Sequence, residues 1–314
     1  MNATVALADV LALLGAIAAA AAGGAAFVRG VVDVSTLLRL PRMLVASTLA
    51  AFATSSPELS VSTLAALAGK PGIGLGDALG SNVVNLGLIL GAALLFGALP
   101  ARIDAFRRDF VLALAVPVLT FVLAFDGSLS RADGALLLVV LAAWLTLAAL
   151  DAKASRRDAL PAAGPAPHPA RAWLLLAVGL ACLLLAGRLF VTGSSGIALA
   201  LGVHPFVVGA TVVAIGTSLP ELVTVLVSRL NGHDDVGLGT LLGSNLFNGL
   251  GIVGIASSIH PITIAPREIA VALAFGVATV LLMLPRAGRL SRRRGIALVS
   301  AYIAFVTATA ALAQ

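Results

Sequence analysis

The sequence predicts an all-α polytopic membrane protein with ten transmembrane helices in two inverted-topology five-helix repeats. Three observations predict this fold: the composition, the number of long apolar stretches, and a pair of motifs that occurs twice. Of the 314 residues, 60% are hydrophobic and 11% are charged, whereas a soluble domain is nearer to a quarter charged. The net charge of +6 does not indicate nucleic-acid binding, because the basic residues lie in short loops between apolar runs.

Apolar stretches long enough to span a bilayer, about 20 residues each, occur ten times. The run from Met1 to Phe27 lacks a basic region before its apolar part, so we interpret it as a first span rather than a cleaved signal peptide. The fourth span is short, and we expect it to extend to Arg107 or Arg108. The candidates are 4–28, 43–68, 73–98, 110–125, 132–150, 172–193, 204–228, 236–258, 268–285 and 295–313.

Two sequence motifs recur at one fixed offset. The first contains a glutamate after a proline, and the second contains a serine and two amides. Each residue of the first copy lies 163 positions before its counterpart in the second copy. The copies read Thr54-Ser-Ser-Pro-Glu58 and Thr217-Ser-Leu-Pro-Glu221, then Gly80-Ser-Asn-Val-Val-Asn85 and Gly243-Ser-Asn-Leu-Phe-Asn248.

The repeat extends beyond the motifs. Residues 127–134 resemble residues 288–295 at an offset of 161, and these segments precede the fifth and tenth candidate spans. We therefore predict two duplicated halves, residues 1–150 and 172–314. Residues 151–171 join them in a basic stretch rich in Ala and Pro, which we interpret as an exposed cytoplasmic linker.

The number of spans in each half predicts the orientation of the halves. Five is odd, so the two halves must enter the membrane from opposite faces, as in the inverted repeats of many secondary transporters. Sixteen Lys and Arg residues lie in the loops of one face and four in those of the other. By the positive-inside rule the first face is cytoplasmic. We expect a multi-pass protein of the cell (inner) membrane with both termini outside the cytoplasm.

Glu58 and Glu221 are the strongest functional candidates. Glu58 follows Arg42 by 16 positions and precedes Lys70 by 12, which places it near the bilayer midplane on a helix that rises about 1.5 Å per residue. An ionisable side chain at that depth is costly to bury and is a functional candidate by default. The proline before each glutamate should break its helix and free carbonyls and hydroxyls for a cation.

A simpler interpretation is that the glutamates only cap half-helices. Ser55 and Ser218 each precede a glutamate by three positions, as in a capping box with proline in the first turn. Because two copies lie in apolar spans of opposite orientation, we favour a cation site and regard capping as a secondary role.

The second motif supplies neutral oxygen donors. Ser81 and Asn85 are four positions apart and share a helix face, as do Ser244 and Asn248. Hydroxyl and amide oxygens beside a carboxylate suit hard cations such as Ca²⁺ or Na⁺. The alternative is that small residues and amides only hold helices together.

Other polar residues receive structural interpretations. We assign Asn82 and Asn245 to helix packing or backbone bonding, and Asp77 to the start or rim of its helix. Asp234 and Asp235 are expected to be solvated on a loop. Four histidines lie in loops or at interfaces without ligand spacing: His168, His204, His233 and His260.

Together the motifs resemble the two alpha-repeats of the cation/Ca²⁺ antiporter superfamily, the sodium/calcium exchangers, over essentially the whole chain. The resemblance implies one central site on the second, third, seventh and eighth spans, used in alternation by one Ca²⁺ or several Na⁺. It implies Glu58 and Glu221 as the main Ca²⁺ ligands and the first and sixth spans as a sliding gate. The implied lining comprises Thr54, Ser55, Thr217, Ser218, Ser81, Asn85, Ser244 and Asn248, with the backbone carbonyls of Ala51 and Ala214.

Two positions depart from the family pattern. Ala53 replaces the glycine usual before the first Thr-Ser pair, and Asn248 replaces an aspartate found in many prokaryotic and potassium-dependent relatives. The site then holds two carboxylates rather than three, which balance the charge of one Ca²⁺ and argue against a K⁺ co-substrate.

We therefore expect a secondary antiporter that exchanges Ca²⁺ for Na⁺, with membrane lipid as its surroundings, no nucleic-acid partner and no cofactor besides the transported ions. One alternative is a Ca²⁺/H⁺ antiporter in which the two glutamates titrate, because burial disfavours a charged carboxylate. A cation channel with the same ligands is less favoured. An enzyme is least favoured, because no nucleophile–base pair, HExxH or nucleotide-binding glycine motif is present.

Overall fold

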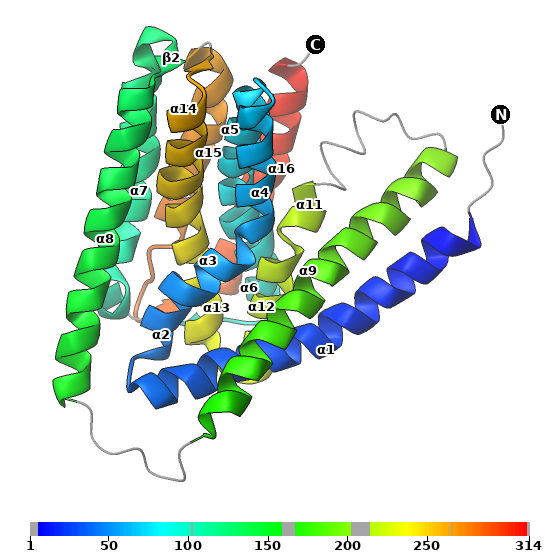
Figure 1. The fold of residues 1–314 in the computed structure, drawn as a ribbon, viewed down its shortest axis with the longest axis vertical. Coiled ribbons are helices and arrows are strands. Elements are labelled where there is room, and N and C mark those ends of the chain that lie inside the picture. Colours follow the sequence, from blue (N-terminus) through cyan, green and yellow to red (C-terminus); the bar gives the residue numbers. More distant parts are fainter. Residues whose placement is uncertain (1–5, 102, 159–166, 202–213, 265, 313–314) are drawn as a thin grey trace.

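The computed structural model describes residues 6–101, 103–158, 167–201, 214–264 and 266–312, which form a bundle of helices (Figure 1). Seven of the described helices are long and apolar enough to cross a membrane, and two shorter apolar helices cover Arg42–Thr54 and Ile269–Leu282. The seven are Leu7–Leu38, Pro71–Leu95, Arg107–Asp126, Arg131–Ser155, Pro169–Ala198, Asp234–Ile259 and Arg292–Ala311.

The first half of the chain contains α1 (Leu7–Leu38), α2 (Arg42–Val45), η1 (Ala46–Ala50), α3 (Ala51–Thr54), α4 (Ser56–Leu67), α5 (Pro71–Val83), η2 (Val84–Leu90), α6 (Gly91–Leu95), β1 (Leu99–Pro100), η3 (Ile103–Ala105), α7 (Arg107–Leu123), η4 (Ala124–Asp126), β2 (Ser128–Leu129) and α8 (Arg131–Asp158). The second half contains α9 (Pro169–Ala200), α11 (Ala214–Thr217), α12 (Leu219–Leu230), α13 (Asp234–Leu246), η6 (Phe247–Ile252), α14 (Val253–Ile259), β3 (Ile262–Thr263), α15 (Pro266–Leu282), β4 (Arg289–Leu290) and α16 (Arg292–Leu312).

Several helices are longer than the sequence predicts. α1 continues past residue 28 to Leu38 and ends where Arg39 adopts a left-handed φ of 54°. α7 begins at Arg107, as expected. α8 runs to Asp158 and α9 begins at Pro169, so both ends of the predicted linker are helical. Residues 159–166 within it, and His204 in the predicted seventh span, lie outside the described residues.

The two spans that carry the first motif are each interrupted at the serine three positions before the glutamate. Ser55 separates α3 from α4 with φ −82° and ψ 12°, and Ser218 separates α11 from α12 with φ −86° and ψ 11°. Pro57 and Pro220 stand in the first turn of the helix that follows, where a missing backbone donor costs nothing. The predicted helix breaks are therefore confirmed.

The fold is mostly helical, as expected, and two short pairs of strands also tie loops together. β1 pairs antiparallel with β4, which joins Leu99 to Leu290, and β2 pairs antiparallel with β3, which joins Leu129 to Ile262. Each ladder is two residues long. A pairing this short leaves no alternating pattern in the sequence, so pattern analysis does not detect it.

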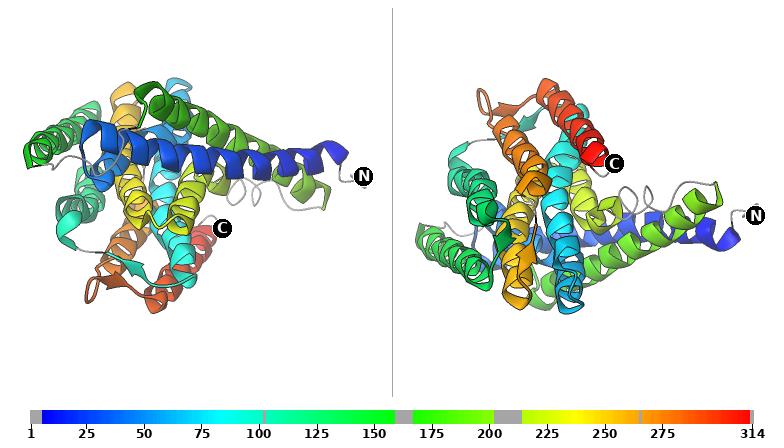
Figure 2. Two further views of the ribbon diagram at one scale, coloured as in Figure 1. Left: turned by 90° about the horizontal axis from the view of Figure 1, so that it is seen from below. Right: turned by 90° about the horizontal axis from the view of Figure 1, so that it is seen from above.

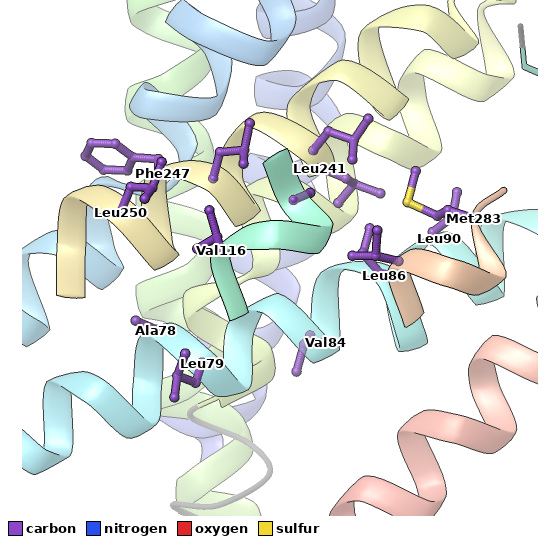
Figure 3. Close-up of a cluster of buried hydrophobic side chains, with 14 of the residues drawn as sticks. Ala78, Leu79, Val84, Leu86, Leu90, Val116, Leu241, Phe247, Leu250 and Met283 are labelled. Carbon is purple, nitrogen blue, oxygen red and sulfur yellow. The ribbon is translucent and has the colours of Figure 1, made fainter. Parts of the chain in front are cut away.

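The spans that carry the second motif form the core. Burial reaches 78% of the most apolar window of Pro71–Leu95 and 94% of that of Asp234–Ile259, against 11–33% for the other five candidate spans. In the main apolar cluster, Leu86 of η2, Val116 of α7 and Leu241 of α13 pack together (Figure 3). The remaining helices surround these two spans.

α1 and α9 lie side by side and extend away from the bundle (Figures 1 and 2). Glycines allow their backbones to approach closely. A Cβ atom added at Gly179 would lie 2.4 Å from the backbone nitrogen of Phe27, and one added at Gly30 would lie 2.5 Å from that of Leu176. Phe27, Val31 and Leu176 then fill a separate apolar cluster.

The two core spans are joined by a reciprocal pair of asparagines. Asn82 Nδ2 donates to the backbone oxygen of Asn245 at 3.2 Å, and Asn245 Nδ2 donates to the backbone oxygen of Asn82 at 3.1 Å. Asn85 Nδ2 adds a bond to Asn245 Oδ1 at 3.1 Å. Both amides are buried, which agrees with the backbone-bonding role expected for them.

We expect Asn245→Ala to destabilise the protein strongly. The change removes the bond to the backbone oxygen of Asn82 and leaves the side-chain amide of Asn85 without its partner in the core, at a cost of about 1–3 kcal/mol for a buried group. The midpoint of thermal unfolding of the purified protein in detergent should fall, whereas Asn231→Ala, at an exposed loop amide, should leave it unchanged. Equal midpoints for the two variants would contradict the structural role of the asparagine pair.

Candidate functional site

The two candidate glutamates lie in equivalent places. Glu58 stands in the first turn of α4 and Glu221 in the first turn of α12, each just after the interruption of its helix. Each side chain is only 1% exposed. Two carboxyl groups are thus enclosed at the centre of an apolar molecule.

Serines from each half bond the glutamate of the other half. Ser55 Oγ donates to Glu221 Oε1 at 3.1 Å, and Ser218 Oγ donates to Glu58 Oε1 at 3.4 Å. Ser244 Oγ also donates to Glu221 Oε1, at 3.1 Å. Neither Ser55 nor Ser218 makes a side-chain cap to its own helix. The capping-box interpretation is therefore wrong, and the two helix breaks face each other across the halves.

Several polar atoms at this centre are buried without a hydrogen-bond partner in the described part of the chain. They are Glu58 Oε2, Glu221 Oε2, Asn85 Oδ1, and Asn248 Oδ1 and Nδ2. A buried polar group left unpaired costs about 1–3 kcal/mol, so a cluster of such groups indicates a function that needs them. The four oxygens are of the donor type that hard cations select.

The remaining residues that were expected to line the site lie on α3, α5 and α11. Thr54 and Ser81 are buried on α3 and α5. Thr54 Oγ1 donates to the backbone oxygen of Ala51 at 3.2 Å, and the Ser55 amide also donates to that oxygen, so the carbonyl expected as a ligand already accepts two bonds. Thr217 ends α11 and Ala214 begins it.

Wide helical turns occur where the second motif ends, which the sequence did not predict. η2 contains Asn85 and η6 contains Asn248, and both are π-helical. Such turns are rare and occur frequently at functional sites. A π-helical turn changes the helix face on which the next side chain emerges. The four-residue spacing from Ser81 to Asn85, and from Ser244 to Asn248, is therefore not enough to place the two side chains of each pair on one face.

Asp77 is a further carboxyl group that the sequence analysis placed at the rim. It lies one turn before Ser81 on α5, only partly exposed, and its Oδ2 atom is buried without a partner among the described residues. No signal separated Asp77 from an ordinary helix-start aspartate, because its counterpart in the second half is a threonine.

The aspartates expected on a loop lie instead in the first turn of α13, and both have basic partners. Asp234 accepts a bond from Arg229 at 3.3 Å and is only 19% exposed. Arg42 lies 2.9 Å from His233 Nδ1 and 3.9 Å from Asp235. The expectation that Asp234 is solvated was therefore wrong, because Arg229 of α12 pairs with its carboxylate and shields it from solvent.

A small cavity adjoins both helix breaks. It has a volume of about 280 Å³ and is bounded by Pro57 of α4, Pro220 of α12 and Gly187 of α9. A Cβ atom at Gly187 would lie 2.8 Å from the backbone oxygen of Gly216. α9 is thus the wall between this cavity and the outside of the bundle.

Among the described residues no three His, Cys, Asp or Glu side chains cluster closely enough to hold a metal ion by themselves. Any cation at this centre would therefore need hydroxyl, amide or backbone oxygens besides the two carboxylates. That mixed donor set is what the interlocked motifs supply.

Comparison with known proteins agrees with this geometry. A sequence model of the family described as "Sodium/calcium exchanger protein" matches residues 9–150 and 171–310. CaxA of Alkalimonas amylolytica is 36% identical over 293 residues, which is 89% of this chain and 91% of CaxA. The inner membrane protein YrbG of Escherichia coli is 32% identical over 282 residues, or 85% of this chain and 86% of YrbG.

The fold also matches a solved structure. The sodium-calcium exchanger NCX_Mj, soaked with zero Na⁺ and Ca²⁺, superposes with a TM-score of 0.82 at 26% identity, over 97% of this chain and 99% of that one. With its apolar helices the chain is a multi-pass membrane protein, and none of these relatives is described as an enzyme. Since the family match covers both halves, the chain belongs to the sodium/calcium exchanger family, within the cation/Ca²⁺ antiporter superfamily.

Proposed function

We propose that this protein is a secondary antiporter that exchanges Ca²⁺ for Na⁺ by alternating access at one central site. The site is built from α3–α4, α5–η2, α11–α12 and α13–η6. The observation that carries the proposal is the pair of enclosed carboxylates, each bonded by a serine of the opposite half and each with one oxygen left unpartnered. The similarity to sodium/calcium exchangers supports the choice of ions.

Charge balance gives the exchange its mechanism. Two carboxylates carry a charge of −2, which one Ca²⁺ neutralises. A group of Na⁺ ions at the same oxygens neutralises it as well, but both sets of ions cannot be held together, so each excludes the other. An empty site leaves two unpaired charges in an apolar interior, which is strongly unfavourable. The loaded forms are therefore the ones that change conformation.

The proposed architecture is ten membrane helices in two inverted repeats, and the strand ladders support it. β1 and β3 begin at Leu99 and Ile262, 163 positions apart, and β2 and β4 begin at Ser128 and Arg289, 161 positions apart. These are the offsets of the sequence repeat, so the two ladders are images of each other. β2 lies at the end of the bundle where α16 finishes, while β4 precedes α16 and so lies at the opposite end (Figure 1).

The ladders also agree with the sidedness derived from charge. β1–β4 joins two loops that the positive-inside rule places in the cytoplasm, and β2–β3 joins two loops that it places outside. Both termini lie toward the same end of the molecule (Figure 1). We therefore propose an inner-membrane protein with both termini outside the cytoplasm.

The α1–α9 pair is the proposed gate. Its two helices are held together by close glycine contacts and project from the bundle as a unit. α9 walls the cavity that reaches both helix breaks. A displacement of this pair relative to the core would open or close the route to the carboxylates without disturbing the asparagine pair.

Glu58→Gln and Glu221→Gln should each reduce Ca²⁺ transport by roughly 100-fold or more, because the amide keeps the shape but removes a charge that neutralises the ion. The measurement is ⁴⁵Ca²⁺ uptake into proteoliposomes with a Na⁺ gradient. Asp104→Asn, at an exposed carboxyl group in the short helix η3, is the control and should transport normally. Normal exchange by both glutamine variants would refute the site.

The coupling ion is tested with two gradients. Proteoliposomes loaded with Na⁺ and diluted into Na⁺-free buffer at equal pH on both sides should take up ⁴⁵Ca²⁺, while a pH gradient without Na⁺ should not drive uptake. Uptake with the pH gradient alone would instead make the protein a Ca²⁺/H⁺ antiporter with titrating glutamates. Ca²⁺ flux that needs no ion on the opposite side would indicate a channel.

Asp77 is proposed to attract cations on their way to the site from the outer side, because it lies one turn before Ser81 on α5 and one of its oxygens is buried without a partner among the described residues. Asp77→Asn should raise the KM for external Ca²⁺ by about tenfold and leave kcat within about twofold. Asp126→Asn, at an exposed carboxyl group of the outer loop, is the matched control. A fall in kcat with unchanged KM would show that Asp77 acts in another way.

A further inference from the structure

A second cavity lies away from the glutamates, on the face that the positive-inside rule places in the cytoplasm. It has a volume of about 580 Å³ and lies between the later part of α1, the first turns of α9 and the loop from α12 to α13. Its polar lining consists of Arg29, Asp33, Arg171, Asn231 and His233. The rest of its wall includes apolar side chains of α1 and α9.

The charges of this cavity are not balanced internally. Among the described residues, neither Arg29 nor Arg171 has an ion-pair or hydrogen-bond partner, and Asp33 is paired with neither of them. The ring of His233 is held by Arg42, which is itself near Asp235. The cavity therefore contains two uncommitted guanidinium groups against one carboxylate.

The two arginines are close enough to act on one ligand. α1 and α9 run antiparallel, with Gly30 against Leu176 and Phe27 against Gly179. In this register Arg171 is level with Ser35, roughly 9 Å along the helix axis from Arg29. Two extended arginine side chains can reach across that distance. Arg171 also lies in the first turn of α9, where the helix dipole favours negative charge.

The chemistry of this lining selects a phosphate group. A guanidinium group binds a phosphate through two parallel hydrogen bonds, and the side-chain amide of Asn231 can donate another. The volume exceeds that of a bare phosphate, and Val28, Val32 and Leu175 offer apolar surface beside the charges. A ligand with a phosphate and an apolar extension, positioned at the membrane surface, fits these features.

We propose that this cavity binds the phosphate of an anionic phospholipid headgroup between Arg29 and Arg171. The lipid would contact α1 and α9 together with the α12–α13 loop, and so would connect the projecting helix pair to the bundle. Asp33 weakens binding of the lipid, because its carboxylate repels the phosphate. Removing the charge of the arginines and removing the charge of Asp33 should therefore change lipid affinity in opposite directions.

The test is lipid binding by the purified full-length protein, measured by native mass spectrometry. Arg29→Gln combined with Arg171→Gln should weaken binding of phosphatidylglycerol by about tenfold or more, and Asp33→Asn should strengthen it. Arg292→Gln combined with Arg293→Gln, at exposed arginines on the same face, is the matched control and should bind as the wild type does. Size-exclusion chromatography checks that each variant is folded.

Four outcomes would overturn the proposal. Unchanged phosphatidylglycerol binding by the folded Arg29/Arg171 variant would remove the arginines from the site. Weaker binding by Asp33→Asn would show that the carboxylate is not repulsive. Equally tight binding of phosphatidylcholine would show that net headgroup charge is not recognised. Displacement of the lipid by inorganic phosphate at equal concentration would overturn the lipid assignment and make this a site for free phosphate. Because binding is read without transport, the result is independent of the proposed exchange.

Discussion

The burial of two carboxyl groups in an apolar interior is the constraint on which the rest of the structure depends. Glu58 and Glu221 are each almost completely enclosed, and neither has an arginine or lysine beside it in the described structure. Hydroxyl donors alone satisfy one oxygen of each group. What neutralises the charge must therefore come from outside the protein, which is the property required of an ion carrier.

Local irregularities of the helices follow from this constraint. Each helix break is followed by a proline in the first turn of the next helix, and the serine at the break bonds the opposite glutamate rather than its own helix. π-helical turns contain Asn85 and Asn248, whose amide oxygens are buried without a partner among the described residues. The asparagine pair, placed between these turns, holds the two spans in register. The π-helical turns and the hydrogen-bonded asparagine pair are thus adjacent. A site that contains unpaired polar groups needs rigid neighbouring segments to hold those groups in place.

The sequence predicted the two helix breaks and the two motif glutamates that the structure buries better than it predicted the limits of the helices. The constant offset of 163 identified both glutamates and their break-forming prolines, because helix packing alone seldom requires a polar motif to recur within apolar sequence. α1 exceeded its predicted end, since an apolar pattern does not indicate where a helix finishes outside the membrane. Asp77 and the π-helical turns were missed because they depend on three-dimensional neighbours. The hydrogen bond from Ser55 to Glu221 of the other half was missed, because the spacing of three positions from Ser55 to Glu58 is that of a capping box.

The crossed serine bonds make the two halves of the chain depend on each other. Ser55 bonds Glu221 and Ser218 bonds Glu58, so the serine before each helix break serves the glutamate of the opposite half. Each half therefore supplies a hydroxyl donor to the buried carboxyl group of the other half. Loss of either serine would therefore remove a donor from the glutamate of the opposite half and leave the glutamate of its own half bonded as before.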